Sequence, residues 1–236
     1  MIDYKFQGRL TYIPGGALNV NMSAWPAAGG NWWEPTTGSY TCVAAYQAKG
    51  AADLAASYVN LANPGTYDLT NGNAPAFDTA DGWTFNGPTN NRYLKTGIVW
   101  GAGTWSAIVR YSNAASQWPF GADAGAATSR VGILAYNGGV DARWANGNEK
   151  GGYVRPETGG TMAFADRKAY EDGAAASGGD IPAVGSLPAV EIYIGGLDRS
   201  NGLIAAFVGK IQAIAFYSTT LDATQIGDLH TAMMAL

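Results

Sequence analysis

Charged residues are scarce in this sequence. The 236 residues include 14 Lys and Arg and 18 Asp and Glu, so only 14% are charged, against about 25% in an average soluble domain. The net charge of −4 offers no basic surface of the kind that nucleic-acid-binding proteins present. We therefore expect no nucleic-acid partner. The low charge also favours a surface that is covered in an assembly, but a neutral surface rich in Asn, Thr and Gly explains it equally well.

Cysteine and histidine occur once each, as Cys42 and His230. One cysteine cannot form a disulfide within the chain, and the two residues together cannot supply the ligands of a zinc site. We expect Cys42 to behave as a small buried apolar residue. His230 is expected to be a surface or half-buried residue of a helix, because no Ser-His-Asp set can be assembled around it.

Long apolar runs are also absent. No stretch reaches the roughly 18 apolar residues that cross a membrane, so we expect no membrane insertion. The first residues show no positively charged segment followed by an apolar run, which predicts no secretory signal. These features fit a protein that is made in a host cytoplasm and released by lysis. An extracellular location is the alternative.

Apolar and aromatic residues are plentiful. The chain is 47% hydrophobic, with 13 Tyr and 8 Trp, which is enough for a sizeable core. Proline and glycine interrupt the first forty residues, which predicts an irregular arm over 1–40 ahead of a domain over 41–236. Large rings rarely stay in water, so we expect the arm's three tryptophans, Trp25, Trp32 and Trp33, to dock. They would pack on their own domain or contact a neighbouring subunit.

The rest of the chain shows short alternating segments that are typical of β-strands. In residues 105–111 the odd-numbered side chains form one face and the even-numbered ones the other. Asp172-Gly173 is the usual signal of a tight hairpin, whereas the Gly-rich stretch 121–125 predicts a loop. Further strands are expected over 42–46, 82–87, 93–98, 130–136, 190–194 and 209–217, with a strand pair inside 140–155.

Only the last segment is convincingly helical. Asp222 and Gln225 predict a capping box at its start, and Leu221 and Ile226 are placed as a hydrophobic staple. Apolar residues then recur at helical spacing at 226, 229 and 233. The expected fold is therefore all-β: a two-sheet antiparallel sandwich with an irregular N-terminal arm and a short C-terminal helix.

An ordered set of segments between residues 42 and 236 resembles the laminin-G-like, concanavalin-A-like jelly roll. That family ends with a glycine-led strand, a Leu-Asp-x-x-Gln-Ile type of segment and a short helix. The segments that carry the resemblance are 83–87, 93–94, 105–111, 170–173, 192–196, 209–217 and 221–226.

Residues 44–65 are similar to segments found ahead of such domains in bacteriophage and environmental viral proteins. This resemblance implies a virion protein, such as a fibre, tail, decoration or host-attachment protein. Its expected partners are copies of itself in a homo-oligomer, other virion proteins and cell-surface glycans. A free-standing, secreted carbohydrate-binding lectin is the main alternative.

Enzymes with this fold include glucanases and lyases, so a catalytic role has to be considered. A retaining glucanase needs two carboxyl groups about 5–5.5 Å apart, which a strand supplies as Glu-x-Asp-x-Glu. The chain has no such run: Glu171 and Asp172 are adjacent, and Glu191 stands alone on its strand. We therefore expect no catalytic residues, no cofactor and a protein that is not an enzyme, with a polysaccharide hydrolase or lyase as the less favoured alternative.

A glycan-binding site is predicted in the region 113–155. A sugar needs an aromatic platform for its apolar face and polar side chains for its hydroxyl groups. Alternatively, these rings fill the core or a subunit interface. The candidate residues are Trp118, Tyr136, Asn137, Asp141, Arg143, Trp144, Asn146 and Tyr153.

The resemblance to laminin-G-like domains also implies a Ca²⁺ ion at a sheet rim, held by aspartate side chains and backbone carbonyls. No EF-hand spacing exists, so the ligands cannot be chosen by pattern. The aspartates in or near predicted loops are Asp78, Asp81, Asp123, Asp141, Asp166, Asp180 and Asp198.

Overall fold

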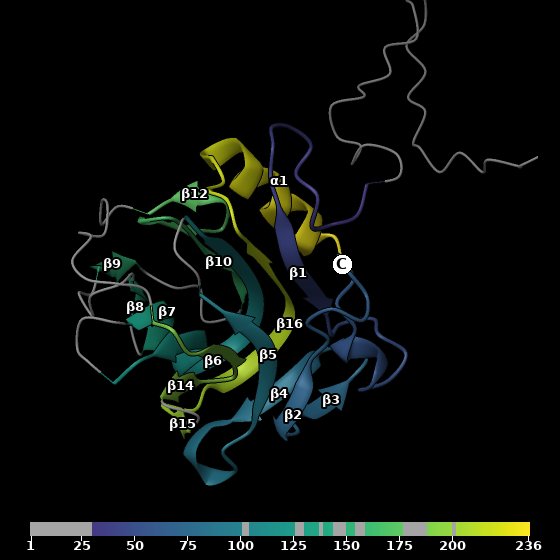
Figure 1. Ribbon diagram of the computed structural model, residues 1–236, viewed down its shortest axis with the longest axis vertical. Coiled ribbons are helices and arrows are strands. Elements are labelled where there is room, and N and C mark those ends of the chain that lie inside the picture. Colours follow the sequence, from purple (N-terminus) through teal and green to yellow (C-terminus); the bar gives the residue numbers. More distant parts are fainter. Residues whose placement is uncertain are drawn as a thin grey trace, which may run out of the picture. The chain divides into compact units, whose positions relative to one another are not determined.

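The protein's structure is a computed structural model that describes residues 30–100, 104–125, 130–136, 139–143, 150–153, 159–176, 188–199 and 202–236. The fold is that of the unit Asn31–Leu236. It consists of two β-sheets and one α-helix, α1 (Ala223–Met234), with two short 3-10 helices, η2 (Ala56–Tyr58) and η3 (Gly87–Thr89) (Figure 1). The predicted all-β sandwich with a short C-terminal helix is confirmed.

Sheet A contains the strands nearest to α1. Its strands follow the order β12, β11, β10, β6, β16 and β1. Strand β1 pairs with the last residues of β16, β4 pairs with its first residues, and β3 pairs with β4. Every pairing between these strands is antiparallel. Their bounds are β1 (Cys42–Gln47), β3 (Ala76–Asp78), β4 (Gly82–Asn86), β10 (Gly160–Ala165), β11 (Lys168–Glu171), β12 (Ala174–Ala175) and β16 (Val208–Tyr217).

Sheet B forms the second layer. Its order is β9, β8, β7, β6, β13, β5 and β2, and β14 pairs in parallel with the end of β6 and antiparallel with β15. Its strands are β2 (Thr70–Asn73), β5 (Tyr93–Val99), β7 (Arg130–Tyr136), β8 (Gly139–Arg143), β9 (Lys150–Tyr153), β13 (Glu191–Ile194), β14 (Leu197–Arg199) and β15 (Leu203–Ile204).

Strand β6 (Ser106–Asp123) belongs to both sheets. Its first part pairs with β10 and β16 in sheet A, and its last part pairs with β7 and β13 in sheet B. Asn113 and Gln117, between the two parts, have φ angles of 51° and 71°. Such left-handed residues interrupt the regular pleat, and strands that change sheets commonly turn at bends and bulges. The predicted loop over 121–125 is therefore wrong for its first three residues, which continue β6.

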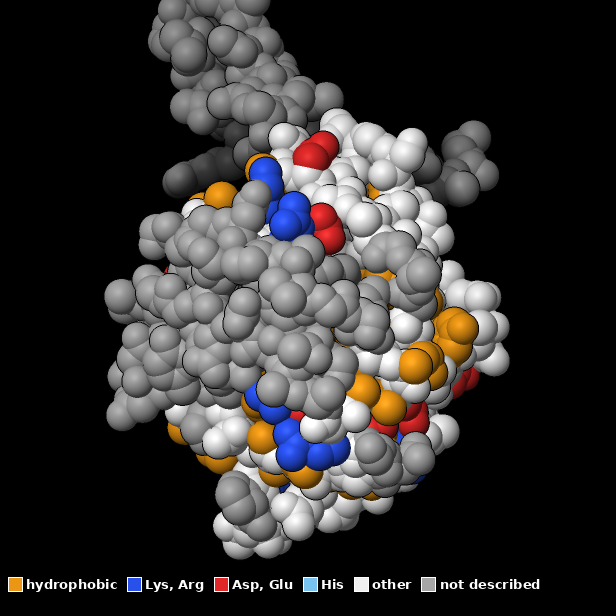
Figure 2. Space-filling model, turned by 60° about the vertical axis from the view of Figure 1, so that its left-hand side comes forward, with side chains coloured by type: hydrophobic (Ala, Val, Ile, Leu, Met, Phe, Trp, Pro, Cys, Tyr) orange, Lys and Arg blue, Asp and Glu red, His pale blue; other side chains and the backbone are white. Residues whose placement is uncertain are grey.

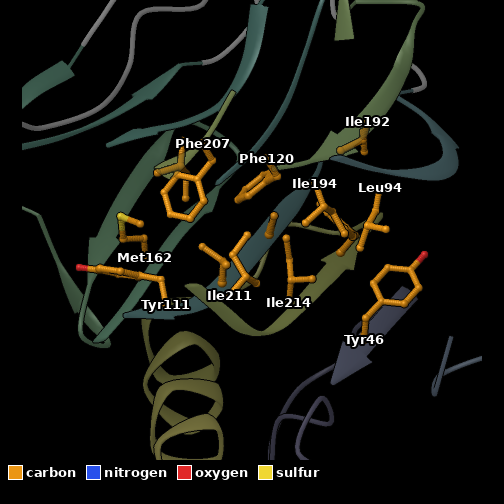
Figure 3. Packing of buried hydrophobic residues seen from close by; sticks show 14 of the residues in the cluster. Tyr46, Leu94, Tyr111, Phe120, Met162, Ile192, Ile194, Phe207, Ile211 and Ile214 are labelled. Atoms are coloured by element: carbon orange, nitrogen blue, oxygen red, sulfur yellow. The ribbon is translucent and has the colours of Figure 1, made fainter. Parts of the chain in front are cut away.

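The main core lies between the two sheets. Figure 3 shows Phe120 and Ile194 of sheet B pointing toward Ile211 and Ile214 of sheet A. The ring centroids of Phe120 and Phe216 lie 5.4 Å apart in an edge-to-face arrangement, a favoured geometry for aromatic pairs. The alternation predicted for residues 105–111 is confirmed, since all four odd-numbered side chains enter this core.

A second cluster lies on the other face of sheet A, under α1. Leu229 and Met233 of the helix are fully buried there, and the predicted capping box between Asp222 and Gln225 is present. The sheet offers mostly alanine to the helix, and a surface of short side chains lets a helix axis approach closely. The alanines in this cluster are Ala45, Ala163, Ala165, Ala213 and Ala215.

The segment ahead of β1 packs against the same cluster. Trp32 is buried in it, and Trp33 lies edge-to-face against Trp32 with ring centroids 5.6 Å apart. The hydroxyl group of Tyr217 donates a hydrogen bond to the carbonyl oxygen of Trp33 at 2.8 Å. The side-chain amide of Gln225 donates a hydrogen bond to the carbonyl oxygen of Thr37 at 2.9 Å. Trp32 and Trp33 thus contact their own domain, while Trp25 lies outside the described residues.

Candidate functional site

The end of β6 brings a carboxylate to the face of sheet B that points away from the core. Phe120 and Ala122 lie in the core between the sheets. Since successive side chains of a strand alternate between faces, Gly121 and Asp123 belong to the opposite face. Asp123 is nevertheless fully buried, with 0% of its surface exposed. A buried charge is expensive unless it is paired, so its partners define the site.

Two arginines hold Asp123. Arg130, at the start of β7, and Arg199, at the end of β14, both lie directly opposite Asp123 in their ladders. Arg130 donates a hydrogen bond from Nε to Oδ2 of Asp123 at 2.9 Å, and its Nη2 lies 2.8 Å from the same oxygen in an ion pair. Arg199 donates to this oxygen through Nη2 at 2.7 Å. The backbone N–H of Gly125 donates to Oδ1 at 2.8 Å. We call Asp123, Arg130 and Arg199 the Asp123 site.

The electrostatics of the Asp123 site favour the ionised carboxylate. Burial of the Asp123 carboxyl raises its pKa, but the hydrogen bonds from Arg199 and Gly125 and the charge of Arg130 outweigh burial, so the pKa lies below its ordinary value. One carboxylate therefore faces two guanidinium groups that stay charged at any physiological pH. The three side chains together carry a net charge of about +1.

Trp118 supports Arg130 from one side. The guanidinium carbon of Arg130 lies 5.7 Å from the centroid of the Trp118 ring, in cation–π geometry. The ring passes over Gly132 of β7, where an added Cβ would come within 2.5 Å of the carbonyl oxygen of Phe120 and 3.0 Å of Trp118 Cε3. Glycine is required at this position because the backbone and the ring leave no room for a side chain.

Tyrosines continue this face of sheet B beyond the arginines. Tyr193 of β13 lies opposite Gly121 of β6, and its ring centroid is 4.7 Å from that of Tyr93 on β5. The ammonium group of Lys95 lies 5.9 Å from the same ring. Burial and the charge of the nearby Asp198 carboxyl raise the pKa of Tyr193, so its hydroxyl group stays protonated. The face combines aromatic rings with cationic and hydrogen-bonding groups.

The predicted glycan-binding residues are only partly covered by the structure. Trp118 is 3% exposed and contacts Arg130. The backbones of Tyr136, Asp141, Arg143 and Tyr153 lie in β7, β8 and β9, with Arg143 directly opposite Gly132 and Asp141 opposite Leu134. Asn137, Trp144 and Asn146 fall outside the described residues. Figure 2 shows this face, with lysine, arginine and hydrophobic side chains gathered together at its lower rim.

Arg130 and Arg199 were not among the predicted site residues, and Asp123 was considered only as a calcium ligand. A usable signal existed for one pair. Asp123 and Arg130 are seven residues apart, at the two ends of a Gly- and Ala-rich turn between apolar segments, which places opposite charges across a hairpin. No local pattern connects Arg199 to this pair, because β14 reaches β6 from 76 residues away.

The calcium candidates do not converge in the described part of the chain, where no group of three or more His, Cys, Asp or Glu residues could hold a metal ion. Asp123 is engaged by two arginines, Asp81 pairs with Lys210, and Asp78 accepts hydrogen bonds from the backbone N–H groups of Ala80 and Asp81. Asp180 lies outside the described residues, and of Asp141 only the backbone is described.

Two other potentially reactive groups, His230 of α1 and Cys42 of β1, are each partly exposed. His230 is half-buried, as predicted, and its Nδ1 lies 2.9 Å from the hydroxyl oxygen of Thr161, which is 1% exposed. Burial raises the pKa of the Cys42 thiol to about 12, so the thiol stays protonated and unreactive.

A surface pocket of about 320 Å³ lies elsewhere, between the β10–β11 turn with Arg167 and the residues that lead into α1. It contains none of the predicted glycan-binding residues, and Asp166 is the one calcium candidate in its lining. Within the part of the chain that the structure describes, the helices are too short or too polar to span a bilayer.

Comparisons with known proteins identify the fold but no family. No protein-family model matches the chain, and no curated protein matches it significantly. Among solved structures, it is similar to Trypanosoma rangeli sialidase in complex with 2,3-difluoro-KDN, with a TM-score of 0.59 and 16% identity over 82% of this chain and 33% of the sialidase. The same sialidase with 2,3-difluorosialic acid, a covalent intermediate, gives 0.58 and 16% over 95% and 36%. The chain thus spans about a third of the length of the sialidases that it matches.

The CBM40 of the Ruminococcus gnavus IT-sialidase is a weaker match, with a TM-score of 0.43 and 17% identity over 54% of this chain and 83% of the module. The prediction that the protein is not an enzyme is contradicted, because the chains that share its fold over most of its length are sialidases, which are enzymes. None of these chains is described as a virion protein, so the virion role and the homo-oligomer stay predictions. The β-sandwich, with the jelly-roll character that the resemblance implied, is what this chain shares with the sialidases.

Proposed function

We propose that the Asn31–Leu236 unit binds carbohydrate at the outer face of sheet B, through the Asp123 site and the tyrosines beside it. The observation that carries the proposal is the packing of Arg130 between Trp118 and the buried Asp123. Sugar sites need rigid polar groups next to aromatic surface. Trp118 and Tyr193 are buried and hold the charged groups in place, and the half-buried Tyr93 is the ring that reaches the surface. The fold matches about a third of the length of the similar sialidases, and this likeness supports a role for the chain as a domain of a protein that acts on glycans.

The test is a glycan array with the full chain, followed by calorimetry with the best ligand. The double variant Arg130→Gln/Arg199→Gln should lose at least a hundredfold in affinity, since each lost charge-assisted hydrogen bond is worth about 1.5–3 kcal/mol. Arg167→Gln is the matched control, because Arg167 and Arg199 both have side chains that are 42% exposed. Absence of any bound glycan, or equal binding by the double variant and the control, would contradict the proposal.

A second candidate function is hydrolysis of a sialoside, which the likeness to sialidases favours. Incubation of the full chain with a fluorogenic sialoside tests it directly, because cleavage releases the fluorophore. Release above the rate of a heat-denatured sample would establish the activity, and no release at high enzyme concentration would exclude it for this substrate. Host attachment by a virion protein would use the same glycan-binding surface, and its test is binding of the full chain to host cells.

A further inference from the structure

We propose that the Asp123 site recognises the carboxylate of an acidic sugar, and this inference rests on the proposed carbohydrate binding. The first argument is the number of donors. A guanidinium group carries five N–H bonds in a planar fork. Asp123 occupies Nε and Nη2 of Arg130 and Nη2 of Arg199. Within the part of the chain that the structure describes, the Nη1 groups of both arginines take no part in these contacts, and they are the donors that we assign to a ligand.

Access to solvent differs between the acid and its two partners. Asp123 is 0% exposed, whereas the side chains of Arg130 and Arg199 are 20% and 42% exposed. The negative charge of Asp123 therefore lies below the protein surface, whereas the positive charges of the two arginines are at the surface. An incoming molecule meets guanidinium groups first, and a carboxylate is the sugar substituent that matches their planar geometry with two parallel hydrogen bonds.

The arginines are also held in place before any ligand arrives. Arg130 is fixed by a hydrogen bond and an ion pair with Asp123 and by the Trp118 ring, and Arg199 is anchored to the same carboxylate. A side chain that is already ordered loses little rotamer entropy on binding, which strengthens binding relative to a free surface arginine. Asp123 is thus a positioning residue, and the two arginines are the groups that contact the ligand.

The experiment compares acidic and neutral ligands that differ only at the carboxylate. The full chain is titrated calorimetrically with polygalacturonate and its fully methyl-esterified form, and with sialyllactose and its carboxyl methyl ester, so that the arms separate a uronic acid from a terminal nine-carbon acid. We expect one acidic ligand to bind at least tenfold more tightly than its neutral counterpart. Arg199→Gln should remove most of that preference, Arg199→Lys should retain part of it, and Arg167→Gln should leave it unchanged.

The outcomes separate this inference from the proposed function. Equal binding of acidic and neutral ligands, with the arginines still required, would overturn the carboxylate inference and leave carbohydrate binding standing. Binding of none of the four ligands, together with an empty glycan array, would overturn both. An equal loss in Arg199→Gln and Arg167→Gln would also overturn the inference, because it would reflect overall charge. Circular dichroism of each variant confirms that the fold is intact.

Discussion

The two outer faces of this sandwich are built from different side chains. The outer face of sheet A presents alanines, and α1 and the segment around Trp32 cover them with fully buried apolar groups. The outer face of sheet B carries Trp118, Tyr193 and the paired charges of the Asp123 site. Figure 1 places α1 and the strands β7–β9 on different sides of the domain.

The two outer faces contribute differently to stability and to ligand binding. A face of small apolar groups gains free energy only when something packs closely on it, and the chain's own helix does so over sheet A. The arginines on sheet B satisfy a buried carboxylate and are themselves partly exposed. We therefore expect substitutions under α1 to change stability and leave ligand binding alone, and substitutions in the Asp123 site to change ligand binding as well.

The largest effect is expected from Leu229→Ala. Leu229 of α1 is fully buried against sheet A, and removal of a buried leucine side chain costs about 3 kcal/mol through lost burial and the cavity left behind. Urea denaturation followed by tryptophan fluorescence gives the free energy of unfolding. Met234→Ala, at a helix position that is 45% exposed, should change it little. A similar loss in both variants would show that α1 is not packed as described.

Ala215→Leu tests whether the alanines of sheet A are needed for the approach of the helix. Ala215 is fully buried under α1, and extra methyl groups in a packed site cost about 2 kcal/mol by forcing neighbours apart. Ala174→Leu, on the exposed strand β12, provides the control with the same added volume. If Ala215→Leu is as stable as the wild type, the space between helix and sheet is larger than the buried alanines indicate.

Asp123→Asn tests how much the carboxylate on sheet B contributes to stability, and how that contribution changes at acid pH. Because the folded pKa of Asp123 lies below its ordinary value of 3.8, the stability that its carboxylate contributes is present above about pH 3.8. That stability is lost as pH falls through the lower folded pKa. At pH 7 we expect Asp123→Asn to lose about 1.5 kcal/mol. Its unfolding free energy should fall less with acidification than that of the wild type, and a parallel fall in both proteins would contradict the assignment.

The smallest effect is expected at the start of α1. Asp222→Ala removes the side chain that accepts a hydrogen bond from the backbone N–H of Gln225 at 2.9 Å, and loss of an N-cap costs about 1 kcal/mol. Asp222→Ser keeps an acceptor and should recover most of this loss in thermal unfolding. Glycan binding should be the same in both variants. A reduction in binding would show that the two faces are coupled.

Prediction from sequence worked best where a pattern is local. The capping residues Asp222 and Gln225 lie three positions apart, and the alternation over 105–111 needs only neighbours along one strand. The Asp172-Gly173 hairpin also depends on a few adjacent residues, and both have positive φ angles, 47° and 78°. In each case the physical cause, a hydrogen bond or a side-chain direction, acts within a few residues.

The candidate site was harder to predict because it depends on contacts between distant segments. The polar and aromatic composition of region 113–155 drew attention to Trp118, but its role as support for Arg130 requires the hairpin of β6 and β7. The stretch 121–125 looked like a loop because glycine and alanine weaken strand propensity. The pairing of its first three residues with β7 overrides that weakness.

The sequence by itself determined the all-β class and the terminal helix with its cap, because each follows from composition or from interactions between near neighbours. Only the tertiary structure decided that β6 serves both sheets and that Arg199 meets Asp123. These features depend on which strands lie side by side, and the free energy that selects a strand's partner comes from the packing of the whole domain.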